Sequence, residues 1–321
     1  MSLIVQKFGG SSVADTERLL HSAALTRRAY AAGDDVIVVV SAQGDSTDRL
    51  LQKARELAPS PPPRELDALL VAGEQASAAL TAMALSSLGV PAVSLNAWQA
   101  PIEAVGAHGD ARIERIGRER IRDALAHRRV AVVTGFQGVN DREDAVTLGR
   151  GGSDYSAVAL AAAFGAARCL IYTDVDGVYT ADPRQCPTAR RLARVSYADM
   201  YALSHAGARV LHDKCVALAQ ERGVEPEVRG VDADSVGTRV CAEGDGRAVV
   251  GVTCRPREDG RAAVTVVGET SLALQKRAHA ALDAAGIDTL GVDAAERAVT
   301  LLVPQERAQQ ALCAVHDALI G

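Results

Sequence analysis

The stretch DDVIVVVSA, from Asp34 to Ala42, is the clearest indicator of the fold of this 321-residue chain. Its run Val36–Val40 is apolar at every position, whereas a strand with one face in water alternates apolar and polar residues. A short continuous apolar run is typical of a strand covered on both faces, as in a parallel sheet between two layers of helices. We therefore predict an α/β fold with a mostly parallel central sheet.

The rest of the first 240 residues combines short strands with longer Ala- and Leu-rich segments. We expect further strands at residues 92–95, 130–134 and 169–172, and a helix from about 64 to 88 that follows the loop PSPPP (Pro59–Pro63). The composition changes near Gly237, which places a domain boundary at about residue 240. These patterns predict a three-layer α/β/α domain over residues 1–240.

Residues 241–321 show a second, smaller pattern. In chain order we expect strands at 248–254 and 262–268, a helix at 272–285, strands at 287–292 and 298–303, and a helix at 305–319. In both helices apolar residues recur at helical spacing, so each helix offers one apolar stripe to one face of a small sheet. We predict a small α+β domain over residues 241–321.

Composition and charge exclude several classes of protein. The formal charge of −5, without a long run of Lys or Arg, argues against nucleic acid or an anionic membrane as the main partner, which leaves a small molecule. The six cysteines form no C-x-x-C pair and have no histidine at zinc spacing, so we expect reduced thiols and no metal held by protein side chains. No stretch approaches the roughly 20 apolar residues that span a bilayer, and we expect a cytoplasmic protein.

The stretch VQKFGGSSVAD (Val5–Asp15) places a lysine before two glycines, at the point where a strand turns into a helix. Glycine has no Cβ, so backbone N–H groups at Gly9 and Gly10 can approach an anion closely, and Lys7 adds a positive charge. The same corner is often only a tight turn, so this stretch alone leaves both interpretations open.

A second glycine cluster favours the interpretation of these corners as anion-binding sites over that of simple tight turns. TLGRGGSDYSAVALAAA (Thr147–Ala163) again places glycines and a cation, Arg150, before a helix. Two such entrances indicate a cradle for a polyphosphate and an anionic acceptor, although neither a P-loop nor a G-x-G-x-x-G pattern is present. IYTDVDGVYTADPR (Ile171–Arg184) then follows a buried strand, where open α/β sheets hold ligands, although such a loop can also merely turn the chain.

Together these stretches closely resemble the amino acid kinase family and, within it, the aspartokinases. KFGGSSVAD resembles the signature at the start of the family's domain, GEQ at 73–75 its substrate helix, GFQGVN and TLGRGGSD its acceptor site, and YTDVDGVYTADPR its nucleotide loop. The resemblance extends from about residue 3 to 240. It implies a kinase that uses ATP and Mg²⁺ to phosphorylate the β-carboxylate of L-aspartate.

The resemblance also implies a role for each matching residue. It assigns catalysis to Lys7 and Asp154; phosphate binding to Gly9, Gly10, Ser11, Gly151 and Gly152; the substrate pocket to Ser41, Thr47, Glu74, Arg150 and Ser153; and nucleotide binding to Thr173, Asp174, Tyr179, Asp182, Arg184 and Arg209. A carboxylate acceptor needs no general base, so we expect catalysis by alignment and by neutralisation of the phosphoryl oxygens.

Three positions depart from the family pattern. Tyr155 brings a bulky phenol near the expected acceptor pocket, Arg209 replaces a nucleotide-contacting lysine, and Asp213 replaces a proline. Tyr155 keeps open a kinase for a different carboxylate in specialised metabolism. A weakly active regulatory subunit is a further alternative, although such a subunit would not need Lys7, Glu74 and Arg150 together.

The C-terminal residues 241–321 resemble one ACT domain, a ferredoxin-like regulatory unit, with its last strand supplied first. Aspartokinases commonly carry two such domains, which bind amino acid effectors across a subunit interface. We therefore expect residues 241–321 to support a homodimer, and end-product inhibition by lysine or threonine to be weak or absent.

Overall fold

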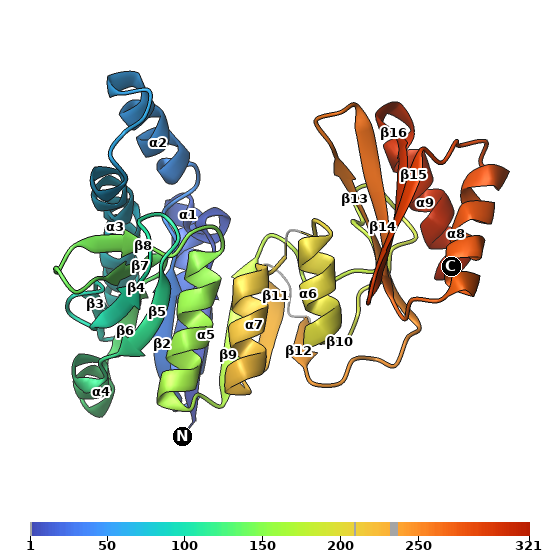
Figure 1. Cartoon of the computed structure of the whole chain (residues 1–321). Coiled ribbons are helices and arrows are strands. Elements are labelled where there is room, and N and C mark those ends of the chain that lie inside the picture. The colour runs from blue at the N-terminus through green and yellow to red at the C-terminus, as the bar shows by residue number, and fades with distance from the viewer. Residues whose placement is uncertain (1, 209, 232–236) are drawn as a thin grey trace. The chain divides into compact units, whose positions relative to one another are not determined.

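The computed structural model of the chain describes residues 2–208, 210–231 and 237–321 (Figure 1). The chain divides into two compact units. The first unit comprises Met1–Asp176 and Leu218–Ser235, and the second comprises Gly177–Ala217 and Val236–Gly321. Each unit is described by itself below. The division into a catalytic domain at residues 1–240 and a regulatory domain at 241–321 is defined by function, and it stays a prediction.

The centre of the first unit is a parallel sheet. Its strands lie in the order β11 (Pro226–Gly230), β9 (Arg168–Thr173), β1 (Leu3–Phe8), β2 (Asp35–Val40), β6 (Val130–Thr134) and β3 (Ala92–Leu95), and each pairs in parallel with the next. Every residue of Val36–Val40 is at most 1% exposed. The continuous apolar run therefore marks a strand covered on both faces, as predicted.

Helices cover both faces of this sheet. They are α1 (Thr16–Ala31), α3 (Pro63–Ser87), α4 (Glu119–Ala126) and α5 (Gly152–Phe164). Helix α2 (Ser46–Leu57) packs against α3, and the residues of α7 (Asp213–Arg222) are divided between the two units. Side chains of α1 and α3 share a core with Phe8, Val38 and Val132, whereas α5 packs against β1, β2 and β9 (Figure 1). The predicted three-layer α/β/α architecture is confirmed.

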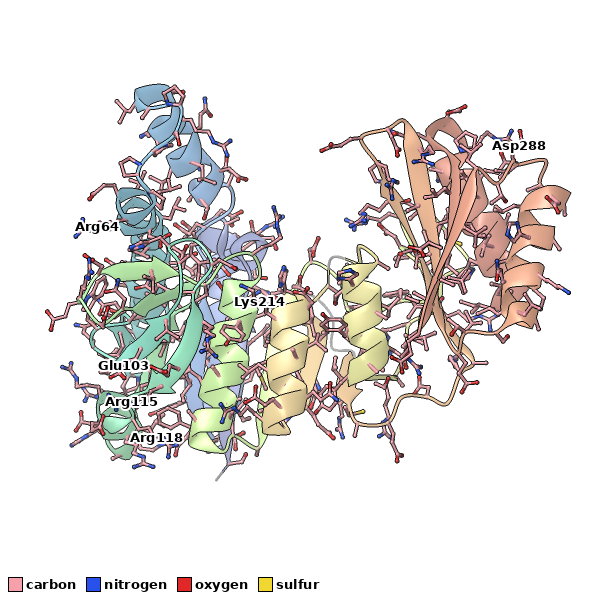
Figure 2. All side chains as sticks on the ribbon, in the orientation of Figure 1. Arg64, Glu103, Arg115, Arg118, Lys214 and Asp288 are labelled. Atoms are coloured by element: carbon pink, nitrogen blue, oxygen red, sulfur yellow. The ribbon has the colours of Figure 1, made fainter. Side chains whose placement is uncertain are left out.

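A smaller sheet adjoins the central sheet in the first unit. It consists of β5 (Arg112–Ile116), β4 (Ile102–Val105), β7 (Gln137–Val139) and β8 (Ala145–Thr147) in that order. Glu103 of β4 and Arg115 of β5 form an ion pair across neighbouring strands (Figure 2). Tyr155 departs from the family pattern, and its ring packs against a hydrophobic cluster that includes Val146 and Leu148.

Helix α3 corrects one expectation. It is long and apolar enough to cross a membrane by length and composition, although we expected no such stretch. Half of its most apolar window is buried, and the helix packs against α1, β3, β6 and β8. These contacts are those of a core helix, and its buried face also carries Asp67 and Glu74.

The second unit contains the predicted C-terminal pattern. Strand β10 (Arg194–Ser196) precedes α6 (Tyr197–His205) and pairs in parallel with β12 (Thr238–Cys241). The antiparallel sheet that follows has the order β13 (Val249–Pro256), β14 (Arg261–Gly268), β16 (Ala298–Pro304) and β15 (Gly291–Ala295), with α8 (Leu272–Ala284) and α9 (Ala308–Leu319). The succession of strands and helices is the one predicted, which confirms the small α+β domain.

The largest difference in this unit is the start of β15, at Gly291 rather than at residue 287. Gly286 adopts a left-handed φ of 64°, and the Ile287 N–H donates to the Leu282 carbonyl. Ile287 therefore closes the end of α8 and buries its side chain in the core. A second, smaller difference is that the turn Gln305–Arg307 is a 3₁₀ helix before α9 begins.

Candidate active site

Lys7 and Asp154 form the centre of the candidate site. Lys7 is paired in register with Val39 and Ile171, so its side chain leaves the sheet on the face that α5 covers. Asp154 lies in the first turn of α5. Lys7 Nζ is 2.6 Å from Asp154 Oδ1, and both side chains are almost fully buried. The two residues that the sequence assigns to catalysis therefore lie together as an ion pair.

The glycine corner after β1 is tightly packed. A Cβ at Gly10 would lie 2.7 Å from the Ala42 carbonyl oxygen, and a Cβ at Gly9 would lie 3.4 Å from Lys7 Nζ. The Gly9 N–H donates to the Tyr172 carbonyl at 3.3 Å, whereas the part of the chain that is described offers no acceptor to the Gly10 N–H. The expectation that both glycines offer N–H groups to phosphate stays a prediction; the Gly10 N–H is open for such a contact, whereas the Gly9 N–H already makes one long hydrogen bond.

The helix expected after these glycines begins later. Gly10–Val13, which includes Ser11, is a 3₁₀ helix, and α1 starts only at Thr16. Asp15 is the N-cap of α1, where its side chain accepts a hydrogen bond from the Arg18 N–H at 2.9 Å. The positive end nearest to Lys7 is therefore a short 3₁₀ turn rather than the end of a long α-helix.

The second glycine loop needs glycine for its backbone. Gly149 and Gly151 have φ angles of 78° and 72°, in the left-handed region that favours glycine. The Gly152 N–H donates to the Gly149 carbonyl at 3.0 Å, so this group is also engaged within the protein. Ser153 is buried and packs closely against Gly135. Arg150 is exposed, and within the described ranges no carboxylate pairs with it.

Glu74 is a buried carboxylate with one free oxygen. Its Oε1 accepts a hydrogen bond from the Ala42 N–H at 3.0 Å, while Oε2 is buried and has no partner among the residues described. Burial raises the pKa of Glu74 to about 7. The preceding residue, Gly73, allows this approach, because a Cβ there would lie 2.8 Å from the Ala42 Cβ.

The loop after β2 brings the acceptor residues next to the glycine corner. The Ser41 N–H donates to the Phe8 carbonyl at 3.1 Å, and the Gly44 N–H donates to the Gly10 carbonyl at 3.0 Å. Ser41 and Thr47 are both half-buried, with Thr47 in the first turn of α2. Because Glu74 also binds this loop, the structure gathers Lys7, the first glycines, Ser41 and Glu74 at the carboxyl edge of β1 and β2.

The residues of the expected nucleotide loop fall in both units. In the first unit Thr173 and Asp174 follow β9, and the Thr173 hydroxyl donates to Asp174 at 3.1 Å. In the second unit Tyr179 forms a β-bridge with Arg191, and Asp182 accepts hydrogen bonds from Arg184 at 3.0 and 3.1 Å. Burial raises the pKa of Asp182, but the hydrogen bonds from Arg184 outweigh this effect and hold it below the usual value.

Of the remaining predicted positions, Arg209 lies outside the described residues. Asp213, the first residue of α7, forms an ion pair with His212 at 2.7 Å.

Asp67 on α3 is a structural residue of the site that the sequence analysis missed. It is 2% exposed and accepts hydrogen bonds from the Thr147 N–H and hydroxyl at 3.0 and 2.6 Å, and from the Gly109 N–H at 3.0 Å. His108 Nδ1 lies 2.8 Å from the same carboxylate. These contacts fix the start of the second glycine loop. Asp67, Glu74 and Thr81 recur every seven residues on the buried face of α3, which is the signal that could have identified Asp67.

Two further polar groups were not singled out from the sequence, although Gln137 belongs to the stretch GFQGVN that resembles the acceptor site. Thr134 Oγ1, at the end of β6, and Gln137 Oε1 are buried without a hydrogen-bond partner among the described atoms. Gln137 Nε2 donates to the Val71 carbonyl at 3.3 Å. Because unpartnered buried polar atoms are costly, these two atoms are candidates for contacts with a ligand.

One group of side chains in the described part of the chain has the composition of a metal site. Cys186, His316 and Asp317 offer ligand atoms within 4.8 Å of one another. This set contains a thiol and an imidazole, which suit zinc rather than the oxygen ligands that Mg²⁺ prefers. The Thr188 hydroxyl lies between all three, at 3.2 Å from the thiol, 3.2 Å from the imidazole and 2.5 Å from the carboxylate, so hydrogen bonds join the group.

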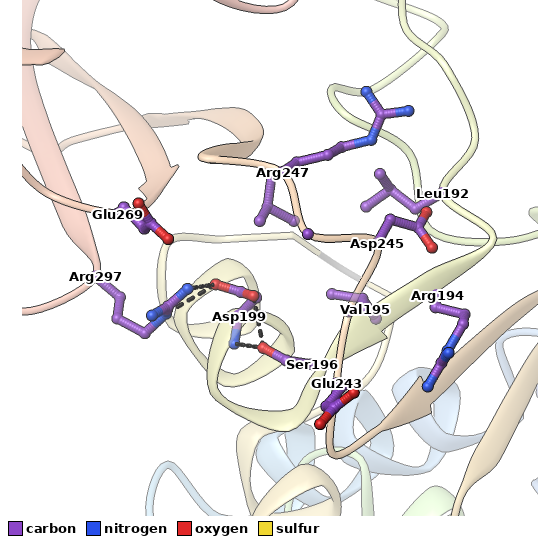
Figure 3. Close-up of a pocket in the computed structure, with 13 residues that line it drawn as sticks. Leu192, Arg194, Val195, Ser196, Asp199, Glu243, Asp245, Arg247, Glu269 and Arg297 are labelled. Carbon is purple, nitrogen blue, oxygen red and sulfur yellow. Dashed lines mark hydrogen bonds and ion pairs between the residues drawn. The ribbon is translucent and has the colours of Figure 1, made fainter.

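The second unit also contains a pocket of about 330 Å³ (Figure 3). Its wall includes Asp199, which accepts hydrogen bonds from the Arg297 guanidinium and from Ser196, as well as the charged residues Arg247 and Glu269. Charges of both signs face each other across this pocket. Its lining holds Arg194, Arg247 and Arg297 together with four carboxylates, so the positive charges are matched by negative ones.

Comparison with known proteins gives consistent matches. The model of the amino acid kinase family matches residues 2–229. The chain is 52% identical over 241 residues to the aspartokinase of Mycolicibacterium smegmatis, covering 75% of this chain and 57% of that protein. It is 47% identical over 268 residues to the aspartokinase of Geobacillus stearothermophilus, covering 84% and 66%. The chain thus spans less than two thirds of these relatives.

Solved structures give similar matches. The chain superimposes on E. coli aspartokinase III in complex with aspartate and ADP with a TM-score of 0.85 and 21% identity, covering 99% of this chain and 100% of that one. It superimposes on the aspartate kinase from Synechocystis with a TM-score of 0.68 and 29% identity, covering 99% and 69%. At 21% identity, the first of these matches concerns the fold alone.

Proposed function

The chain belongs to the amino acid kinase family, and we propose that it transfers the γ-phosphoryl group of ATP to the side-chain carboxylate of L-aspartate, giving 4-phospho-L-aspartate. The substrate is inferred from the curated relatives, which are aspartokinases. The observation that carries the proposal is the buried Lys7–Asp154 pair at 2.6 Å, beside two glycine loops.

In this proposal Lys7 neutralises charge on the phosphoryl group in flight. Its ammonium is nearly buried, so its field acts in a region of low effective dielectric constant. Asp154 holds the ammonium in position. The attacking atom is a carboxylate oxygen that already carries charge, so no group has to remove a proton, and the residues act by alignment.

The acceptor pocket would select an amino acid over a plain dicarboxylate. Glu74 Oε2 is buried without a partner in the described part of the chain, which suits it to accept hydrogen bonds from an α-ammonium. Arg150 is exposed and has a planar fork that can bind a carboxylate in a bidentate manner. Ser41, Thr47 and Ser153 would complete the pocket.

The co-substrates in this proposal are ATP and Mg²⁺. Gly9, Gly10, Ser11, Gly151 and Gly152 would line the phosphates, and Thr173, Asp174, Tyr179, Asp182 and Arg184 would bind the rest of the nucleotide. Mg²⁺ prefers oxygen ligands and is commonly held by substrate phosphates. The group Cys186, His316 and Asp317 does not fit it, so we assign the ion to the phosphate oxygens and derive no step through it.

The C-terminal sheet supports a proposal about assembly. Strand β15 lies at one edge of this sheet, and its exposed residues include Val292, with Leu290 exposed just before it. An exposed strand edge with apolar side chains is suited to pair with a second copy, so we propose a homodimer.

For this chain we also propose weak inhibition by lysine and threonine. All six thiols are free, which agrees with a cytoplasmic location.

The test is an assay that traps acyl phosphate with hydroxylamine in the presence of ATP and Mg²⁺. We expect signal with L-aspartate, and little with succinate, which lacks the ammonium that Glu74 would bind. Glutamate and N-acetylaspartate complete the panel. Signal with another acid but not with aspartate would contradict the substrate, and silence with every acid would contradict the kinase and favour a regulatory subunit.

A further inference from the structure

We propose that His316, on the C-terminal helix α9, positions the segment Tyr179–Arg190 and is therefore a positioning residue for nucleotide binding. This inference rests on the proposed function, because it assigns Tyr179, Asp182 and Arg184 to ATP. It gives α9 a role in holding the segment that carries Tyr179, Asp182 and Arg184. All the contacts that carry it lie within the second unit.

The imidazole of His316 joins two hydroxyl groups of this segment. The side chain is fully buried, with Nε2 at 2.8 Å from Thr180 Oγ1 and Nδ1 at 3.2 Å from Thr188 Oγ1. Nδ1 also lies 3.2 Å from Asp317 Oδ1, to which the Thr188 hydroxyl donates a hydrogen bond at 2.5 Å. One side chain from α9 thus holds both ends of the stretch Thr180–Thr188.

The protons in this network can be assigned. Thr180 Oγ1 accepts a hydrogen bond from the Arg190 N–H at 2.9 Å, so its own proton is free to be donated to His316 Nε2. His316 then carries a proton on Nδ1, which it donates toward Asp317. In this tautomer both ring nitrogens are engaged, and none keeps a free lone pair for a metal. The network is therefore complete without an ion.

Thr180 is fixed by its backbone as well. Its N–H donates to the Arg190 carbonyl at 2.9 Å, and its carbonyl accepts from the Val252 N–H of β13 at 2.7 Å. A Cβ at Gly251 would lie only 3.0 Å from this carbonyl oxygen. Thr180 is therefore hydrogen-bonded to Arg190, to β13 and to α9. Tyr179 and Asp182 lie within two residues of it in the chain.

The rest of the segment is built into the core of the C-terminal domain. Ala181 and Cys186 are buried in the same hydrophobic cluster as Val252 and Leu312. The Gln185 carbonyl accepts hydrogen bonds from Gln309 Nε2 and from the Cys313 thiol of α9, both at 3.2 Å. Displacing His316 would therefore loosen the one polar contact between α9 and Thr180, while the apolar contacts keep the domain folded.

The experiment compares His316→Ala, Thr180→Val and the double variant with the parent chain, with Gln310→Ala on the exposed side of α9 as the matched control. Three quantities are measured: hydrogen exchange of the amides in 179–190, the Kd for ADP by calorimetry, and KM for ATP and for aspartate. We expect faster exchange and an approximately tenfold weaker Kd in each single variant, with KM for aspartate unchanged.

Two further results would support the positioning role. The loss of ADP affinity in the double variant should be clearly less than the sum of the two single losses, because both substitutions remove the His316–Thr180 contact. His316→Gln, whose amide can both accept and donate, should recover most of the affinity. Unchanged exchange or an unchanged Kd for ADP in His316→Ala would overturn the inference, and so would an equal rise of both KM values.

These readouts separate this inference from the proposed function. If the parent chain binds ADP but phosphorylates no acid, the proposed reaction fails, while exchange and ADP affinity still decide the role of His316. If the parent chain binds no ADP, both proposals are overturned.

Discussion

The Lys7 ammonium lies 2.6 Å from the Asp154 carboxylate, although the two residues come from the first strand of the chain and from a helix that follows β8. The contact depends on register. Lys7 is paired with Val39 and Ile171, which places its side chain under α5. The first turn of α5 then presents Asp154 at the carboxyl edge of the sheet, where open α/β folds bind ligands.

The first prediction concerns this pair. Replacing Lys7 with Ala should lower kcat for aspartate phosphorylation by roughly 10² to 10³, the scale for one preorganised donor. Steady-state kinetics with saturating ATP and aspartate measure the effect. Lys53→Ala, at an exposed position of α2, is the matched control and should leave kcat unchanged. A Lys7→Ala variant with near-normal turnover would remove Lys7 from the mechanism.

The second prediction concerns the pH dependence of aspartate capture. Burial raises the pKa of Glu74 to about 7, and only the ionised carboxylate attracts an α-ammonium. Because kcat/KM reports ionisations of the free enzyme, kcat/KM for aspartate should rise with pH up to about 7. Glu74→Gln should lower kcat/KM and abolish this rise. A wild-type profile that is flat between pH 6 and 8 would contradict the role of Glu74.

The third prediction applies the same pKa to stability. The folded state favours the protonated Glu74, so its contribution is fully present below the unfolded value near 4.5 and is lost as pH rises to about 7. The loss amounts to at most about 3 kcal/mol of unfolding free energy. Urea titrations at pH 4.5 and 7.5 of the wild type and of Glu74→Gln measure the difference. An equal pH dependence in both proteins would contradict it.

Local patterns predict part of the fold well. The unbroken run Val36–Val40 indicates a strand covered on both faces, because burial on each face requires an apolar residue at every position. The end of α8 is harder to locate. Ile287 is β-branched and apolar and therefore resembles the first residue of a strand, yet its N–H and its side chain complete the end of the helix. Propensity cannot distinguish these two uses of one residue.

The candidate site likewise has residues that local patterns predict and contacts that they do not. Lys7 is identifiable because it lies in a motif with a physical reason for its glycines, whereas the resemblance to the family supplies the role of Asp154. The Gly9 N–H is engaged by Tyr172, a residue distant in sequence, and no local pattern reveals that contact. The link between Thr180 and His316 likewise joins two remote segments through a single imidazole. Such contacts follow from tertiary packing, which one sequence does not encode in any short stretch.

The fourth prediction concerns the close packing of α3 on the loop after β2. A Cβ at Gly73 would lie 2.8 Å from the Ala42 Cβ, so Gly73→Ala must move the helix or the loop and lengthen the hydrogen bond from the Ala42 N–H to Glu74. We expect KM for aspartate to rise about tenfold, as for the loss of one charge-assisted hydrogen bond, with KM for ATP less affected. Ala72→Ser, exposed on the same helix, is the control. Equal changes in both KM values would contradict a specific effect on Glu74.

The fifth prediction concerns Asp67, whose carboxylate accepts hydrogen bonds from Thr147 and Gly109 and lies 2.8 Å from His108. Asp67→Ala leaves the buried N–H and hydroxyl of Thr147 without an acceptor, which should lower the unfolding free energy by about 3 kcal/mol. Asp67→Asn keeps the shape and one acceptor oxygen, so its loss should be smaller. Urea unfolding measures both variants. Because Thr147 begins the loop that carries Arg150, Asp67→Asn should also raise KM for aspartate, and an unchanged KM would show that Asp67 stabilises the fold without positioning the acceptor loop.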